Sequence, residues 1–511
     1  MEYWSILLLI VIGALSIHYL FRNFNFFKRH GVLHFPLATT FGITASLMFK
    51  RMSIIDFLLK LYNFNPDAKY IGIYVMKEPA ILLRDPELIK FILVKDFEAF
   101  PDRRGFSGLD EPLIAKNLFS LRGENWRNVR TLLSPSFTSS KMKMMFTLMS
   151  ECAEDFTKFL STLPENKSEM DMKDAFSRYA NDVIATCAFG IKINSMKDPT
   201  NTFYAYGKEL VNFSRERPLK FLFLRTFPSI ARIFNIKFIN DNVSKFFKDI
   251  IRTTIATRDA EHITRPDMLQ LMMDIRGKEG RRELDIDDIT AQAFVFFLGG
   301  FDTNSTAMSF AAHEIAANPE VQAKLQQEID EILEESNGAV SYESVNKLEY
   351  LNAVINEVLR LYPPVGFLDR KCEKPYELPP ALPGEKPFVV NKGMNFWIPT
   401  YAIHNDKKYY DNPEKFYPER FLNNKMHHYS FCYMPFGLGP RMCIANRFAL
   451  LELKVLLFHL LARCELKPSA KTTSPIKFSK NLIPMPENGF WLNIQRRKDI
   501  NPILKSMVVD G

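Results

Sequence analysis

One cysteine near the C-terminus lies in a setting that could present a thiolate to a metal. Cys443 ends the run Phe-Gly-Leu-Gly-Pro-Arg-Met-Cys at 436–443, and a long apolar helix is expected from about 445 to 461. Glycines let the backbone turn tightly, so that amide N–H groups can point at the sulfur. The helix places the positive end of its dipole behind the cysteine. A thiolate held in this way can serve as the axial ligand of a haem iron. The alternative is a structural cysteine buried after a Gly-rich turn.

A second candidate lies inside the apolar stretch 287–317, which predicts one long helix interrupted by Gly-Gly-Phe-Asp-Thr. Two glycines within a helix cost about 1 kcal/mol each relative to alanine, so we expect a planar cofactor to approach closely at Gly299 and Gly300. Thr303 can bond back to the carbonyl one turn earlier and open the helix, and Asp302 can relay protons through water. The alternative is close helix packing through glycine, with Asp302 as a solvated charge.

Two helical spacings pair residues that suit a haem site. Trp126 and Arg130 are four apart and share a helix face, where an indole N–H and a guanidinium could hold the two haem propionates. For Trp126 alone, a buried core tryptophan is the alternative. Glu357 and Arg360 are three apart on another helix, a spacing that by itself is usually a surface ion pair of little energetic weight.

The composition predicts a well-packed chain. Of its 511 residues 47% are hydrophobic and 13% aromatic, including 45 phenylalanines, which is ample for a core and argues against disorder. Further helices are expected at 320–335 and 345–361, and the stretch 70–83 alternates and turns like a β-hairpin. No linker, repeat or low-complexity tract divides the body, so we expect one domain.

Charge and cysteine usage exclude several classes of protein. The net charge of +8 comes without a Lys/Arg run, so a nucleic-acid partner is not expected. An anionic membrane surface or an acidic redox partner fits better, and a simply solvated surface is the alternative. The six cysteines include no CxxC pair, which argues against a disulfide framework or a zinc site and favours a reducing compartment.

The N-terminus predicts a membrane anchor. Residues 3–21 are almost wholly apolar, close to the minimum length of a bilayer span, and Arg22, Lys28 and Arg29 follow. This positive flank should stay in the cytosol and place the short N-terminus in the lumen. The features of a cleaved signal peptide are not evident, so we expect an uncleaved anchor.

The aromatic and basic segment 213–247 predicts a second membrane contact. Lysines and arginines interleave there with phenylalanines, as in a surface that rests on a bilayer. The alternative is a pair of core helices.

Together these motifs resemble those of the cytochrome P-450 monooxygenases, and they occur in that family's order. The matching segments are the anchor, Trp-x-x-x-Arg, Gly-Gly-Phe-Asp-Thr, Glu-x-x-Arg, Pro-Glu-Arg-Phe at 418–421 and the cysteine loop. The resemblance covers nearly the whole chain and implies a mainly α, triangular catalytic domain with a small β region at 37–500. It further implies a transmembrane anchor at 1–21, a linker at 22–36 and a C-terminal tail at 501–511.

Two further stretches narrow the resemblance. The run 126–137 and the turn 369–372 are similar to the microsomal branch that includes xenobiotic-metabolising enzymes of vertebrates and insects. The chain departs from the family at Ala445, where glycine is usual, and at Asp302, where glutamate is commoner. Alanine tolerates the start of a helix, so haem binding is expected to survive. Aspartate keeps the charge but shortens the proton path.

The resemblance implies a role for each candidate residue. Cys443 would be the axial ligand of haem b, while Asp302 and Thr303 would manage proton delivery. Glu357, Arg360 and Arg420 would form an ion-pair network that supports haem insertion and takes no part in catalysis. Residues that would surround or hold the haem are Trp126, Arg130, Arg370, Arg441, Phe436, Gly437, Gly299 and Gly300, with Arg103 as a weaker candidate. Residues that could line the substrate cavity, or equally belong to the core, are Phe106, Leu113, Phe119, Phe297, Phe301, Val365, Phe367, Ile483 and Met485.

The implied reaction inserts one atom of dioxygen into a lipophilic substrate, such as an insecticide or a plant toxin, and the other atom leaves as water. The sequence shows no dinucleotide or flavin motif, so electrons from NADPH would come from a separate flavoprotein reductase, with a cytochrome b-type protein as a further donor. Lys141, Lys143, Arg127 and Arg447 are candidates for the docking face. The enzyme would face the cytosol on the endoplasmic reticulum membrane.

Three alternatives to this function stay open at the level of sequence. The first is a hydroxylase of endogenous steroids or fatty acids with the same fold. The second is an enzyme that rearranges peroxides or isomerises substrates without dioxygen, against which Thr303 argues. The third is a haem-binding sensor or carrier without turnover.

Overall fold

The computed structural model describes most of the chain beyond its N-terminal stretch. It covers residues 4, 11, 13, 23, 25–75, 78–106, 109, 111–211, 216–274, 284–423, 431–480, 484–499 and 501–503. The predicted anchor at 1–21, apart from isolated positions, and the cavity candidate Ile483 lie outside the described residues. Within the ranges given, no helix is both long enough and apolar enough to cross a membrane.

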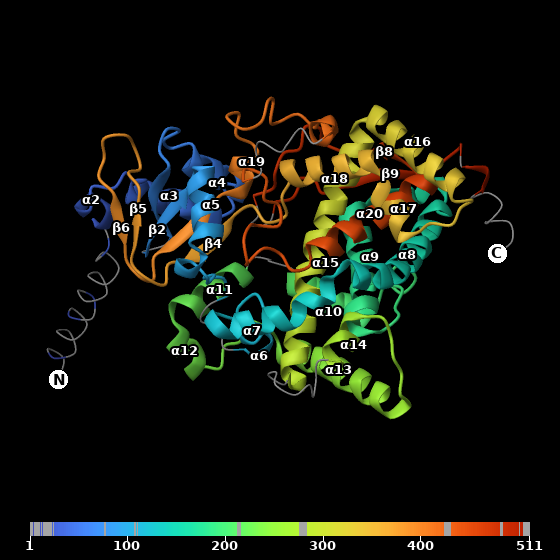
Figure 1. The fold of residues 1–511 in the computed structure, drawn as a ribbon, viewed down its shortest axis with the longest axis horizontal. Helices are drawn as coiled ribbons and strands as arrows, with labels where there is room; N and C mark the ends of the chain where they lie inside the picture. The colour runs from blue at the N-terminus through green and yellow to red at the C-terminus, as the bar shows by residue number, and fades with distance from the viewer. Residues whose placement is uncertain are drawn as a thin grey trace.

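Helices make up most of the described fold. They are α2 Phe26–Arg29, α3 Leu37–Met48, α4 Ile54–Tyr62, α5 Pro86–Lys90, α6 Pro112–Ala115, α7 Gly123–Leu133, α8 Ser139–Ser161, α9 Met172–Ile184, α10 Thr202–Val211, α11 Glu216–Thr226, α12 Pro228–Ile233, α13 Asp241–Glu261, α14 Met268–Met273, α15 Ile286–Ala317, α16 Pro319–Glu335, α17 Tyr342–Lys347, α18 Glu349–Leu361, α19 Thr400–His404 and α20 Asn446–Arg463. Shorter turns include the π-helices η1 Phe91–Lys95 and η5 Ala185–Phe189. Figure 1 shows α8, α9, α15 and α20 gathered at one end of the molecule.

The strands of the described residues form three small sheets. They are β1 Tyr70–Val75, β2 Glu78–Leu83, β3 Glu169–Asp171, β4 Leu368–Lys371, β5 Tyr376–Leu378, β6 Phe388–Val390, β7 Asn395–Ile398, β8 Cys464–Pro468 and β9 Trp491–Arg496. The largest sheet has the order β1-β2-β7-β4, and the others are β3-β9-β8 and β5-β6. The largest sheet lies with α3 to α5 at one end of the molecule, opposite the end that contains α8, α9, α15 and α20 (Figure 1). The predicted mainly α class with a small β region is therefore confirmed.

The largest sheet contains the predicted hairpin and one residue of the candidate site. β1 and β2 pair antiparallel with Tyr70 opposite Leu83, which confirms the hairpin expected at 70–83. β4 runs antiparallel to β7, with Arg370 opposite Phe396. The sheet thus fixes the position of a candidate haem-binding arginine.

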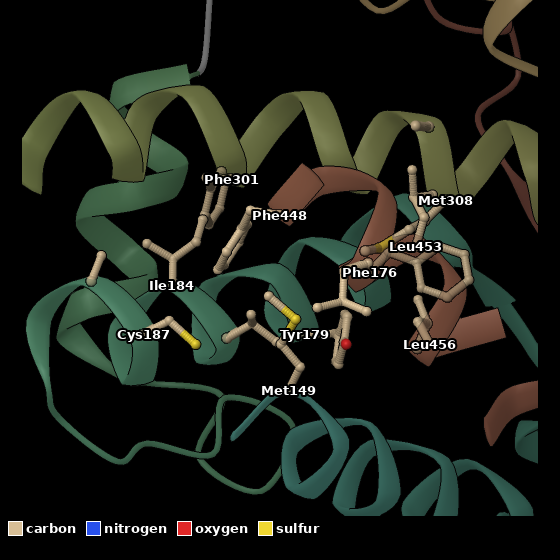
Figure 2. Close-up of a cluster of buried hydrophobic side chains, with 14 of the residues drawn as sticks. Met149, Phe176, Tyr179, Ile184, Cys187, Phe301, Met308, Phe448, Leu453 and Leu456 are labelled. Atoms are coloured by element: carbon tan, nitrogen blue, oxygen red, sulfur yellow. The ribbon is translucent and has the colours of Figure 1, made fainter. Parts of the chain in front are cut away.

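The helix α15 runs through the helical part of the fold and carries the predicted oxygen-binding segment. Its N-terminus is capped by Asp285, whose side chain accepts from the backbone N–H of Asp288 at 2.6 Å. The helix ends at 317, as the sequence predicts. It packs on α9 and α20, and the cluster between them, which includes Phe301 and Phe448, excludes water from this side of the helix (Figure 2).

The single helix expected at 345–361 is in fact two helices. Leu348 separates α17 from α18, with an extended backbone at ψ 96°. The first N–H groups of α18 are capped from α16, because the Glu328 carboxylate accepts from Tyr350 at 2.7 Å and from Leu351 at 3.0 Å. A cap supplied by another helix leaves no mark in the local sequence, so this boundary could not be predicted.

The segment 213–247 is divided between surface and core. The exposed apolar residues at α12 and its two ends are Phe227, Ile230, Ile233 and Phe234, with exposed fractions of 48%, 42%, 78% and 71%. Phe238 and Phe247 are instead buried, at 9% and 0%. The surface available to a membrane is therefore narrower than expected, and the core alternative describes the C-terminal end of the segment.

Candidate haem and oxygen site

The Gly-rich turn before α20 holds Cys443 by its backbone. The N–H of Cys443 donates to the carbonyl of Phe436 at 2.8 Å. Gly437 and Gly439 have φ values of +78° and +70°, a region that residues with a side chain rarely adopt. α20 begins at Asn446, one residue after the expected start. The turn thus places the cysteine just before the N-terminus of the helix, as the sequence predicts.

Gly439 is required by space as well as by backbone conformation. A Cβ at this position would overlap the carbonyl oxygen of Leu93 and lie 3.5 Å from the Cα of Val94, both in η1. A Cβ at Gly437 would meet its nearest atom, in Leu368, at 3.7 Å. The cysteine loop therefore rests on the backbone of η1 at a point where a glycine is needed.

We expect Gly439→Ala to destabilise the haem-loaded protein more than Gly437→Ala does. Both substitutions force alanine into the left-handed region, at about 1–2 kcal/mol each. Only Gly439→Ala also collides with backbone, which adds about 1–3 kcal/mol. Thermal unfolding and haem content of the two purified variants test this. Equal losses would show that contact with Leu93 is not the cause.

Burial and hydrogen bonding act in opposite directions on the Cys443 thiol. Burial raises its pKa, while the backbone N–H of Ala445 and the charges of Arg103 and Arg130 lower it. A coordinated metal ion deprotonates a thiol outright. The N–H group and the two guanidinium groups would then stabilise the thiolate.

Four arginines converge beside this loop. Arg103 donates to the carbonyl of Arg441 at 2.7 Å. Burial, with a further contribution from the charge of Arg103, lowers the pKa of Arg370 and of Arg441 to about 9. Burial also lowers the pKa of Arg130, and the charge of Arg103 again adds to this. The four side chains therefore form one cluster of mutually repelling cations.

The carboxylates near this cluster are already engaged. Arg441 donates to Asp102 at 2.9 Å. Asp369 accepts from the backbone N–H of Arg104 at 2.6 Å. Arg370 donates through Nη1 to a carbonyl, but its Nε and Nη2 are buried and have no hydrogen-bond partner among the described residues. The cluster thus has unused donors and an excess of positive charge.

These features fit a haem. Buried guanidinium N–H groups without acceptors are costly, and the two propionates of a haem supply acceptors of the opposite charge. Cys443 would hold the iron, and Arg103, Arg130 and Arg370 would face the propionates. Arg441, which is paired with Asp102, would contribute mainly through its charge.

Trp126 is buried beside the arginine cluster. Its ring is buried, 5.7 Å from the ring of Phe97, and the guanidinium carbon of Arg441 lies 4.0 Å from its centroid. This cation–π contact holds Arg441 in the cluster. Trp126 therefore packs as a core residue that orients an arginine, and its contact with a propionate stays a prediction.

α15 borders open space at the Gly-Gly-Phe-Asp-Thr segment. A Cβ on Gly299 would meet no described atom within 4 Å, so α15 borders open space on the side where the expected cofactor would approach. Thr303 donates to the carbonyl of Gly299 at 2.5 Å, the expected bond to the preceding turn. A Cβ on Gly300 would lie 2.7 Å from the Cδ1 of Ile184 on α9. The expectation that a cofactor approaches Gly300 is therefore wrong. Gly300 allows α15 to pack closely on α9, which was the alternative interpretation.

Asp302 is not a solvated charge. Its Oδ1 lies 2.9 Å from the Nζ of Lys173, which comes from α9. The two residues are 129 positions apart, and nothing in either local sequence marks the pair. Lys173 is thus a site residue that sequence reasoning missed.

A buried carboxyl group connects α15 to α20. Glu452 is fully buried, and the side-chain amide of Asn304 donates to its Oε2 at 2.5 Å. Burial raises the pKa of Glu452 to about 8, although the bond from Asn304 lowers it. In the folded chain this group is therefore mostly protonated at pH 7. It was also missed from the sequence, because a glutamate within an apolar helix gives no sign of its partner.

Glu452→Gln should reduce the loss of stability with rising pH. The folded pKa of about 8 lies above the ordinary 4.5, so between these pH values the folded chain binds more protons than the unfolded chain. Stability is therefore lost as pH rises through this window, by up to about 1.4 kcal/mol per pH unit. Unfolding midpoints at pH 5 and pH 8 test this. Between pH 5 and pH 8 the unfolding midpoint of wild type should fall more than that of Glu452→Gln. Glu377→Gln, at an exposed position, should behave like wild type.

The structure brings Glu357, Arg360 and Arg420 together. Arg360 donates to both carboxylate oxygens of Glu357, at 2.7 and 2.8 Å, and neither side chain is exposed. Arg420 lies 3.5 Å from the same carboxylate. The N–H of Tyr417 donates to it at 3.1 Å, and Arg360 donates to the carbonyl of His404 at 2.9 Å. The network ties α18 to the segment that leads towards the cysteine loop.

The candidates for the cavity wall divide by exposure. Phe119 and Val365 are the most accessible, at 36% and 46%, and Phe106, Phe367 and Met485 are half-buried. Leu113, Phe297 and Phe301 are buried, at 6%, 0% and 1%.

For Phe297 and Phe301 the core alternative is correct, and the place of Leu113 in the cavity wall stays a prediction. Phe297 packs 5.1 Å from Phe247, and Phe301 lies 5.9 Å from Tyr204. Both rings lie against Gly207, where a Cβ would be 2.6 Å from Phe297. This aromatic cluster joins distant segments of the chain and leaves these rings no open surface.

Two of the four expected docking residues are already paired. Arg127 and Lys143 each lie 2.5 Å from a glutamate of a neighbouring element. Arg447 is exposed and Lys141 is partly exposed. The last two are therefore better placed for a negatively charged partner.

Comparison with known proteins identifies the family. The sequence model of the family described as Cytochrome P450 matches residues 51–494. Cytochrome P450 9e2 of Blattella germanica is 42% identical over 509 residues, which cover 93% of this chain and 94% of that protein. Probable cytochrome P450 9f2 of Drosophila melanogaster is 36% identical, over 97% of this chain and 99% of its own. Cytochrome P450 6a2 of the same fly is 35% identical, over 96% and 99%. The chain therefore belongs to the cytochrome P450 family.

This result confirms the resemblance seen in the sequence. Members of this family are monooxygenases, so the chain is an oxidoreductase, and membership implies a haem cofactor. The similarity to insect members agrees with the branch that the sequence indicated.

Proposed function

We propose that this chain is a microsomal monooxygenase that oxidises lipophilic xenobiotics with electrons delivered from NADPH by a flavoprotein reductase. The observation that carries the proposal is the Cys443 thiol, placed before α20 among an N–H group and guanidinium groups that suit a thiolate. Support also comes from α15, where Gly299 borders open space beside the hydroxyl of Thr303.

The haem, when bound, supplies the iron at which dioxygen is activated. Cys443 would hold that iron through its thiolate. Thr303 presents a hydroxyl at the open side of α15, where it can donate or accept a proton. The side chain of Asp302 is 21% exposed, so its carboxylate can exchange protons with solvent and supply them towards the Thr303 hydroxyl. Arg370 would orient the cofactor through Nε and Nη2, which have no hydrogen-bond partner among the described residues.

The proposed substrates are neutral and apolar, such as insecticides or plant toxins. Support comes from the accessible candidates for the cavity wall, Phe119 and Val365, whose side chains can bury apolar surface but offer no hydrogen bonds. A cavity of this chemistry discriminates by shape more than by functional group.

The proposed location is the cytosolic face of the endoplasmic reticulum membrane. The apolar N-terminal sequence would span the bilayer, and the exposed residues of α12 and its ends would enter the interface. The reductase, and a cytochrome b-type donor, would dock through acidic surfaces on basic residues such as Arg447.

Expression of the full chain with a reductase and NADPH tests the proposal. The chain should fractionate with microsomes, show the thiolate-type carbon monoxide spectrum, and oxygenate some members of a panel of lipophilic compounds that includes 7-ethoxycoumarin, lauric acid and a steroid. Products that require dioxygen support monooxygenation. A haem spectrum with no oxygen consumption would favour a sensor, and products formed without dioxygen would favour an isomerase.

A further inference from the structure

The side chain of Lys173 is inserted between α9 and α15 at the candidate acid. Its Nζ lies 2.9 Å from Oδ1 of Asp302 and 3.1 Å from the backbone carbonyl oxygen of the same residue. It also donates to the hydroxyls of Ser305 at 2.7 Å and Thr306 at 2.8 Å. One ammonium group thus holds three positions of α15 within the turn that contains Thr303.

These contacts are largely shielded from water. The side chains of Lys173 and Asp302 are 13% and 21% exposed. Burial lowers the pKa of Lys173, while the charge of Asp302 and its hydrogen bond raise it. A part-buried ion pair is screened less than a surface pair, and removal of one partner leaves the other charge without compensation.

The same contacts act on the backbone of α15. The hydroxyl of Ser305 donates to the carbonyl of Phe301 at 2.6 Å, and the next carbonyl, that of Asp302, accepts from Lys173. Side-chain donors at successive carbonyls compete with the helix ladder and bend it locally. Lys173 therefore influences the orientation of the whole turn.

We propose that Lys173 is a positioning residue for proton delivery, a role that rests on the function proposed above. Consecutive residues of an α-helix point about 100° apart, so Asp302 faces α9 while Thr303 points to another side of α15. Lys173 holds the Asp302 carboxylate in one conformation and links it to two hydroxyl groups of the same turn. A proton from solvent then passes by way of the Asp302 carboxylate, held in this position, to the side of α15 that carries Thr303.

Lys173→Met tests the proposal, because it keeps most of the side-chain volume but removes the charge and the donors. With NADPH and dioxygen, the full chain and its reductase release oxygenated product plus water from coupled turnover and hydrogen peroxide from uncoupled turnover. With 7-ethoxycoumarin as the probe, we expect the ratio of peroxide to product to rise about tenfold in Lys173→Met. This effect is smaller than that expected when a residue that itself transfers the proton is removed. Lys173→Arg, which keeps the charge and several donors, should restore most of the coupling.

The substrate affinity provides a second measurement that is independent of turnover. Binding of 7-ethoxycoumarin, followed by the change in haem absorption, should be unchanged in Lys173→Met. If this variant does not load haem, Lys173→Gln, which keeps one polar head group, allows the same comparison.

Lys454→Met is the matched control. Lys454 is a half-buried lysine of α20 whose pKa burial lowers, and it donates to Asn346 at 2.9 Å, outside the contacts of Asp302. This variant should keep the wild-type ratio of peroxide to product. Asp302→Asn should raise that ratio, and Lys173→Met should add nothing further in its presence.

Two kinds of failure are distinguishable. A purely structural role for Lys173 would lower the haem content and the unfolding midpoint but leave the ratio per haem unchanged, and that result overturns the proposal. If wild type itself lacks the thiolate spectrum or forms no oxygenated product from any of the compounds, the proposed function fails instead.

Discussion

Replacement of Cys443 by alanine is expected to abolish monooxygenase activity and to remove the red-shifted Soret band of the reduced carbon monoxide complex. The physical reason is the loss of the sulfur, since the N–H of Ala445 and the charges of Arg103 and Arg130 stabilise a negative atom at that position. Difference spectroscopy and haem content of the purified variant measure both effects.

Cys152→Ala is the control for this experiment. Cys152 is a partly exposed free cysteine of α8, and its replacement should leave the spectrum and the activity intact. A Cys443→Ala protein with the wild-type spectrum would contradict the assignment of the axial ligand.

The second large effect is expected at Glu357. Glu357→Gln removes the charge that compensates buried Arg360, and breaking a buried pair from one side costs about 3–5 kcal/mol. That cost is comparable to the total stability of many domains, so little folded haem protein should accumulate. Haem content per chain and the unfolding midpoint after expression at reduced temperature measure the loss.

An exposed ion pair provides the comparison. Lys324 lies 2.6 Å from Glu419, but its side chain is 54% exposed, and such a pair contributes less than about 1 kcal/mol. Lys324→Gln should therefore behave almost like wild type. Equal effects of the two substitutions would mean that burial of the Glu357 network is not what makes it important.

The parts of the fold that could be predicted have local causes. The hairpin at 70–83, the helix α15 and the turn before α20 follow from side-chain periodicity, glycine and capping residues that are close together in the chain. The loop with Cys443 is the clearest example, because its backbone conformation is set by Gly437 and Gly439 themselves. The bond from Thr303 to Gly299 belongs to the same class.

The parts that could not be predicted depend on contacts between distant segments. The pairs Lys173–Asp302 and Asn304–Glu452 join different helices, and neither partner signals the other in its local sequence. Phe297 shows the converse error. A phenylalanine beside the oxygen-binding segment was a reasonable candidate for the cavity wall, but packing on Gly207 from α10 places it in the core.

The cluster of Arg103, Arg130, Arg370 and Arg441 has a consequence for how long the chain survives in a cell. A ligand that binds the folded state but not the unfolded state stabilises the folded state by mass action. When the free ligand concentration is a hundred times Kd, the free energy of unfolding rises by about 2.7 kcal/mol. An anionic porphyrin that neutralises these cations is such a ligand, so newly made chains without it would spend more time partly unfolded and be degraded. The amount of folded enzyme is therefore expected to follow the supply of haem.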